Sequence, residues 1–136
     1  MKEITVEDIA RAVADLAVRA CCRLPQDMVD GMRSALEAEP SPVGKNILEQ
    51  LLENAAIAAS DSIPICQDTG LAVVFADVGQ DVRIVGGAFE DAVNEGIRRG
   101  YVDGYLRKSC VAEPLFERKN TRDNTPAVIH TRLVPG

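Results

Sequence analysis

Four side chains that can do chemistry follow one another at residues 66–69: a thiol, a carboxamide, a carboxylate and a hydroxyl. Pro64 restricts the backbone before the thiol, and Gly70 permits an unusual dihedral or a close approach by a ligand just after it. Loops of this kind often hold functional sites. From the residues alone, Cys66 could be a nucleophile, a metal ligand or a small buried hydrophobic residue.

A second group of polar residues lies in a turn-rich stretch at residues 106–125. The planar guanidinium of Arg107 is suited to bidentate pairing with a carboxylate, although a single arginine is usually a surface charge. Neutral donors around an anionic ligand could come from four further residues, which are also those that any turn would use: Asn120, Thr121, Asn124 and Thr125.

The remaining reactive residues favour structural roles. The chain has one histidine, His130, in an apolar segment where we expect packing or hydrogen bonding instead of catalysis. Cys21 and Cys22 lie on or beside the apolar face of a helix, and we expect Cys110 to pack in the core. No cysteine spacing suggests a disulfide scaffold, so reduced thiols are expected.

Helices are expected on the N-terminal side of the Cys66 loop, and they would position it. Thr5 is a candidate N-cap, with Asp8 three residues later, for a helix that reaches about Arg23. Pro25 can open a second helix, which Pro40 and Pro42 would end. A third helix is expected between residues 45 and 60. The buried face predicted for the first helix consists of Ile9, Val13, Leu16, Ala17 and Ala20.

Strands are expected after the loop. Residues 71–76 form a short apolar run typical of a strand covered on both faces. Residues 82–85 and 127–134 predict two more strands, and a turn at residues 86–87 leads into a helix over residues 89–99. The fold class predicted is α+β, with N-terminal helices followed by a partial mixed β-sheet and a packed helix. The chain is expected to be an incomplete domain.

Composition limits the possible partners. The chain has 136 residues and a formal net charge of −6 that is spread without a basic stripe, which argues against nucleic acid. No apolar run is long enough to span a bilayer and no signal-peptide core follows Met1, so we expect a cytoplasmic protein without a membrane partner. Aromatic residues make up only 4%, which favours a small polar ligand.

Two stretches resemble one family. Residues 64–70, Pro-Ile-Cys-Gln-Asp-Thr-Gly, resemble the first signature of the class I fumarase and L-tartrate dehydratase family of oxygen-sensitive hydro-lyases. Residues 105–127 resemble the fumarase branch in particular. The resemblance implies reversible hydration of fumarate to L-malate, a reaction of the tricarboxylic acid cycle, with an L-tartrate dehydratase alpha subunit as the alternative.

The resemblance also implies the site. In this family three cysteines hold a [4Fe–4S] cluster whose fourth iron binds substrate as a Lewis acid, and the first of those cysteines corresponds to Cys66. Gln67, Asp68 and Arg107 correspond to residues that bind the dicarboxylate, fumarate or malate. Asp68 would also act in catalysis, by orienting a hydroxyl group or relaying a proton.

The same resemblance implies that residues 1–136 are the N-terminal part of the catalytic domain. The other two cluster ligands, much of the substrate clamp and the base would belong to a C-terminal domain or a β subunit, and a homo-oligomer is expected. Alone, the chain should neither hold a complete cluster nor turn over substrate. Two other interpretations are a non-catalytic helical interaction module and a redox-sensing or nucleophilic thiol at Cys66.

Overall fold

The computed structural model describes residues 2–136, and the chain divides into two compact units. One comprises the described part of Met1–Val18 together with Asp68–Gly136, and the other is Arg19–Gln67. We call them the sheet unit and the hairpin unit. Helix α1 (Val6–Cys22) begins in the first and ends in the second. Within residues 2–136 no helix is long and apolar enough to cross a membrane.

The start of α1 follows the predicted capping pattern. The Thr5 hydroxyl accepts a hydrogen bond from the Asp8 N–H at 3.1 Å and donates one to the Asp8 carboxylate at 2.7 Å. These bonds satisfy a backbone donor that has no partner inside the first turn. The N-cap prediction at Thr5 is therefore confirmed.

The hairpin unit contains helices α2 (Gln26–Ala38) and α3 (Pro42–Asp61), which pack on each other. Pro25 is the N-cap of α2, as its fixed φ favours. The prediction that Pro42 helps to end α2 was wrong. Pro42 is the first residue of α3 because Ser41 caps that helix, its hydroxyl accepting from the Gly44 N–H.

In the sheet unit, α4 (Phe89–Asp103) packs closely against α1. Its glycines at positions 96, 100 and 104 recur every fourth residue, so they share one face. A Cβ at Gly96 would lie 2.6 Å from both the Ala10 carbonyl oxygen and the Val13 Cβ. The two backbones can approach this closely only because that face of α4 lacks side chains.

This packing corrects the face predicted for α1. Ala10 and Val13 are buried, but Leu16 is 56% exposed and Ala20 is exposed. Small residues face α4 because the glycine face leaves no room for leucine. The position of the buried stripe was therefore set by the partner helix.

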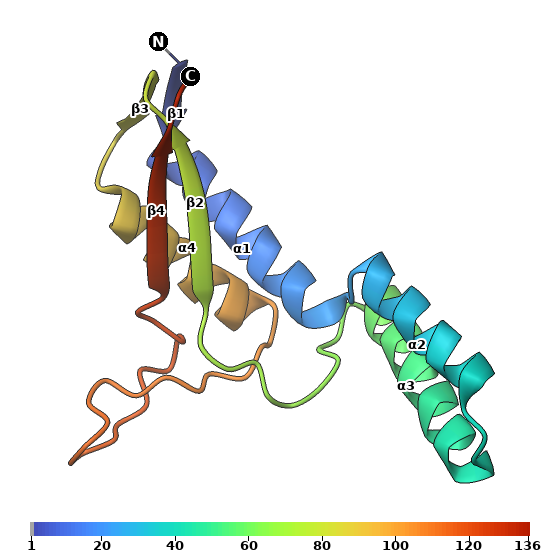
Figure 1. The fold of residues 1–136 in the computed structure, drawn as a ribbon. Helices are drawn as coiled ribbons and strands as arrows, with labels where there is room; N and C mark the ends of the chain where they lie inside the picture. The colour runs from blue at the N-terminus through green and yellow to red at the C-terminus, as the bar shows by residue number, and fades with distance from the viewer. Residues whose placement is uncertain (1) are drawn as a thin grey trace. The chain divides into compact units, whose positions relative to one another are not determined.

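Within residues 2–136, four strands form two parallel pairs, and the α+β class is confirmed. Strand β1 (Lys2–Thr5) pairs with β3 (Val82–Val85), and β2 (Val73–Gly79) pairs with β4 (Val128–Val134). Figure 1 shows β2 and β4 as the two long arrows of the sheet unit. The two parallel pairs replace the single mixed sheet expected, and β1 was not predicted.

The expectation that the strand after Gly70 is covered on both faces was wrong for these residues. In β2, Val74, Ala76 and Val78 are half-buried, but the alternate residues Val73 and Phe75 are 50% and 79% exposed. Alternation of this kind shows that only one face of the strand is packed within the described chain.

Candidate functional site

The Cys66 loop is held to its own unit by the residue before the cysteine. The Ile65 N–H donates to the Cys21 carbonyl at 2.9 Å, and the Asn54 amide donates to the Ile65 carbonyl at 2.9 Å. The backbone of Ile65 is thus anchored to the end of α1 and to a side chain in the middle of α3. Cys66 and Gln67, which follow these anchors, are exposed.

The four cysteines differ in exposure. Cys22 and Cys110 are only 2% and 4% exposed and Cys21 is half-buried, whereas Cys66 is exposed. Burial raises the pKa of the Cys21, Cys22 and Cys110 thiols. Since a ligand thiol must be reachable by a metal ion, the exposed Cys66 is the cysteine best suited to be a ligand. The core positions predicted for Cys22 and Cys110 are confirmed.

Cys66 alone cannot complete a metal centre. Among residues 2–136 no group of three or more histidine, cysteine, aspartate or glutamate side chains is arranged to hold a metal ion. An exposed thiol on an anchored loop fits the role of one ligand among several.

The sheet unit brings together two of the predicted site residues, Asp68 and Arg107. Their closest charged atoms, Asp68 Oδ1 and Arg107 Nη1, are 3.9 Å apart, and the two side chains are 73% and 58% exposed. The Gly70 N–H donates to Asp68 Oδ1 at 3.2 Å, and Gly70 has the positive φ that its predicted role requires. A carboxylate and a guanidinium thus share one exposed surface.

Backbone contacts hold these two segments side by side. The Thr69 hydroxyl donates to the Arg107 carbonyl at 2.5 Å, and the hydroxyl of Tyr101, which is 3% exposed, donates to the Thr69 carbonyl at 3.3 Å. Sequence reasoning missed Thr69 and Tyr101. Nothing local to either residue indicates a partner that lies more than 30 positions away.

Three of the four candidate neutral donors bond within the loop itself, whereas Asn124 also donates to the Gly70 carbonyl outside it. Asn120 donates to the Lys108 carbonyl, Thr121 bonds the Cys110 carbonyl, and the Thr125 hydroxyl donates to Asp123. Asn124 is completely buried. The turn interpretation therefore accounts for the bonds of Asn120, Thr121 and Thr125. The Ser109 hydroxyl, by contrast, is buried with no hydrogen-bond partner within residues 2–136.

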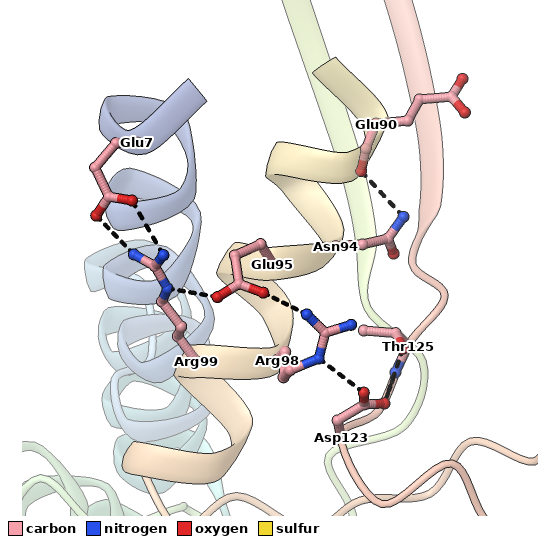
Figure 2. Close-up of polar contacts among 8 residues, drawn as sticks. All are labelled: Glu7, Glu90, Asn94, Glu95, Arg98, Arg99, Asp123 and Thr125. Atoms are coloured by element: carbon pink, nitrogen blue, oxygen red, sulfur yellow. Dashed lines mark hydrogen bonds and ion pairs between the residues drawn. The ribbon is translucent and has the colours of Figure 1, made fainter. Parts of the chain in front are cut away.

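Alternating charges fasten this loop to the helices, as Figure 2 shows. Arg99 on α4 pairs with Glu7 on α1 through two hydrogen bonds of 2.6 and 3.0 Å and with Glu95 at 2.8 Å. Arg98 pairs with Glu95 and, at 3.0 Å, with Asp123. Bonds from Arg99 and then Arg98 lower the pKa of Glu95. The network connects α1, α4 and the end of the loop.

His130 is exposed on β4 opposite Phe75 on β2, and the two rings stack with centroids 4.9 Å apart. On the same strands, Arg132 pairs with Asp77. His130 thus makes the packing contact expected of it, on the exposed face of the β2–β4 pair.

A family model described as fumarate hydratase (Fumerase) matches residues 10–136. The chain is 38% identical over 113 residues to fumarate hydratase 2 of Leishmania major, covering 82% of this chain and 20% of that protein. It is 31% identical over 122 residues to a putative L(+)-tartrate dehydratase subunit alpha of Methanocaldococcus jannaschii, covering 85% of this chain and 40% of that protein.

The L(+)-tartrate dehydratase subunit alpha of Escherichia coli K12 is 29% identical over 124 residues, which cover 91% of this chain and 40% of that subunit. The chain therefore spans less than half the length of these curated relatives. The match reaches both predicted site segments, since residues 66–68 and 107 fall within the range of the family model.

Proposed function

Since this chain belongs to the fumarate hydratase (Fumerase) family, we propose that it forms part of the catalytic domain of a hydro-lyase that reversibly hydrates fumarate to L-malate. The observation that carries the proposal is the meeting of Asp68 and Arg107, 39 positions apart in sequence, on one exposed surface of the sheet unit. A carboxylate next to a guanidinium offers both groups that a hydroxy-dicarboxylate substrate requires.

Arg107 binds a carboxylate of the substrate. Its 3.9 Å contact with Asp68 is longer than a hydrogen bond. A substrate carboxylate would offer the guanidinium a shorter, bidentate and charge-assisted pairing. Gln67, which precedes Asp68 in the chain, supplies an amide donor to the same dicarboxylate.

Asp68 acts on the hydroxyl end of the substrate. Its Oδ1 accepts from the Gly70 N–H, which fixes the plane of the carboxylate. In the proposal Oδ2 accepts a hydrogen bond from the malate hydroxyl, or relays a proton to and from it. The bond from Gly70 thus orients the carboxylate before substrate arrives.

Cys66 supplies one of three thiolate ligands of a [4Fe–4S] cluster, and its exposure on an anchored loop supports that role. When bound, the cluster supplies a Lewis-acidic iron that favours departure of the hydroxyl group. The remaining ligands and the base come from a β subunit or a C-terminal domain. The relatives named as alpha subunits support such a partner. We further propose that the assembled enzyme is a homo-oligomer.

L-tartrate dehydration is the second candidate, because two of the relatives carry that name. L-tartrate differs from malate by one additional hydroxyl group, so Arg107 and Asp68 could serve either substrate. Turnover of L-malate and L-tartrate by the same preparation of the complete enzyme distinguishes them.

The decisive experiment replaces Cys66 by serine in the complete enzyme, with Cys22→Ala as the matched control. Cys66→Ser should remove most of the cluster absorbance and iron and lower the hydratase rate by at least about a hundredfold. A loss of about 2.7–4 kcal/mol, which corresponds to a hundredfold to a thousandfold, is typical of a lost catalytic group. Cys22→Ala removes a buried thiol and should keep the iron. Full iron content and activity in Cys66→Ser would refute the cluster assignment and favour the helical interaction module.

A further inference from the structure

The side chain of Asn124 links the two segments of the candidate site. Its Oδ1 accepts hydrogen bonds from the Ser109 N–H at 2.6 Å and the Cys110 N–H at 3.0 Å. Its Nδ2 donates to the Gly70 carbonyl at 3.0 Å. One amide therefore joins the backbone two residues after Asp68 to the backbone two residues after Arg107.

We infer that Asn124 is the positioning residue that sets the distance between Asp68 and Arg107. The inference rests on the proposed function, in which those two side chains contact the substrate. Asn124 itself does not touch substrate, because it is 0% exposed. It acts through the two backbone segments that it joins.

Asparagine is the residue type that this position requires. Asn124 has a φ of 62°, in the left-handed region that asparagine, aspartate and glycine tolerate best. The position also needs an acceptor for two N–H groups and a donor for one carbonyl, and a short carboxamide provides both. Aspartate would keep the acceptor and lose the donor, and glycine would lose both.

Burial makes this link stiffer than the others between the two segments. The Thr69–Arg107 hydrogen bond and the Asp68–Arg107 ion pair are exposed, so water can replace either partner. The Asn124 side chain is 0% exposed and its bond to the Cys110 N–H is buried, while its bonds to the Ser109 N–H and the Gly70 carbonyl are part-buried. Water therefore competes less for these bonds, and breaking them leaves partly or fully buried backbone groups unsatisfied. Reacting groups must be held within a fraction of an ångström, so the stiffest link determines the geometry.

Asp123, the residue before Asn124, belongs to the network of charged side chains shown in Figure 2. Asp123 accepts bonds from Arg98 at 3.0 Å and from the Thr125 N–H at 3.0 Å. The backbone on both sides of Asn124 is therefore fixed to α4. Asn124 thus connects the site to the best-packed helix of the sheet unit.

Amide hydrogen exchange on the 136-residue chain tests the contacts. Asn124→Asp should keep the Ser109 and Cys110 amides protected, because a carboxylate still accepts from them. Asn124→Gly should raise the exchange rates of both by about tenfold or more, since those amides lose a buried acceptor. Wild-type protection of both amides in Asn124→Gly would overturn the inference.

Kinetics of the complete enzyme with L-malate test the role. Asn124→Asp removes only the bond to the Gly70 carbonyl, in the segment that carries Asp68. Therefore kcat should fall by about tenfold or more while KM stays within about twofold. Asn124→Gly also removes the bonds from the Ser109 and Cys110 N–H groups, in the segment that carries Arg107, so KM should also rise by about tenfold. The matched control is Asn94→Asp, whose side chain accepts from the Ala127 N–H at 2.9 Å and contacts neither segment; both constants should stay near wild type.

A merely structural role predicts a different pattern: both Asn124 variants lose activity in proportion to the folded fraction, with KM unchanged, and that result overturns the inference. Arg107→Lys distinguishes a failure of the inference about Asn124 from a failure of the proposed function. If Arg107→Lys raises KM and Asn124→Gly does not, the inference fails and the proposed function stands. If Arg107→Lys leaves KM unchanged, the proposed function fails and the inference fails with it.

Discussion

Two helix pairs in this chain both carry apolar residues at helical spacing but bury them to different degrees. In α4, which packs on α1, Val93, Ile97 and Tyr101 are 0%, 3% and 3% exposed. In the α2–α3 hairpin, Ile47 and Leu51 are 52% and 47% exposed, and no residue of α2 is buried. Hydrophobic periodicity identifies a helix in both cases. It does not show whether the chain itself covers the apolar face.

The physical difference lies in how closely the backbones approach. The glycine face of α4 lets α1 lie against its backbone, so neighbouring large side chains close over a filled contact. In α3 only the alanines at positions 55 and 58 are buried, and its larger apolar side chains are half-buried or exposed. The contact between α1 and α4 is the one that supports the site, because Tyr101 and Arg98 extend from it to Thr69 and Asp123.

The largest expected effect comes from truncating one isoleucine in each pair. Ile97→Ala should lower the free energy of unfolding by about 2–5 kcal/mol, because it leaves a cavity where a side chain only 3% exposed is packed. Ile47→Ala should change it by less than about 1 kcal/mol, because the side chain is already half in water. Both variants gain the same helix propensity, so the difference reports burial. Urea unfolding followed by circular dichroism measures it, and equal losses would contradict the comparison.

The next-largest effect on the free energy of unfolding should have opposite signs in the two helix pairs. A methyl group at Gly96 would overlap Ala10 and Val13, so Gly96→Ala should cost about 1–3 kcal/mol. A methyl group at Gly31 in α2 has nothing within 4 Å, so Gly31→Ala should stabilise by about 0.5–1 kcal/mol through helix propensity alone. Thermal melts of the two variants should shift in opposite directions. A neutral Gly96→Ala would mean that the helices can separate without cost.

Local signals predicted the parts of the fold that depend on neighbours in sequence. The Thr5 cap, the start of α2 after Pro25 and the turn with positive φ at Gly86 all act within four residues. The α+β class, the three helices before the Cys66 loop and the strand at Val82–Val85 were predicted in the same way. The family resemblance likewise rests on two short contiguous stretches.

The parts not predicted depend on distant partners. Strand β1 exists because β3, about 80 positions away, pairs with it. The close contact of the α4 glycines with α1 depends on residues about 85 positions away in the sequence. Asn124 looked like either a turn residue or a ligand donor, and its burial between Gly70 and Ser109 decides which bonds it makes. No local pattern distinguishes these roles.

The smallest expected effect is a loss of folding stability at acidic pH. It should arise from Asp123, which accepts a hydrogen bond from Arg98 on α4. Burial, the largest single influence on Asp123, raises its pKa, but bonds from Thr125 and Arg98 outweigh it, so the net pKa is lowered. A lowered pKa means that this carboxylate stabilises the fold fully above its ordinary value near 4, and that the contribution is lost as the pH falls through the lower folded value. The ion pair Asp30–Arg33 lies within α2 and joins no two elements.

Asp123→Asn should therefore unfold about 0.5–1 kcal/mol more easily near pH 7 and lose correspondingly less stability on acidification to about pH 3. The two unfolding curves, measured across that range, should converge at the acidic end. Curves that stay parallel would mean that the bond from Arg98 carries no net free energy. The loop would then depend on the buried amide of Asn124 alone, because the charges around it would be screened by water.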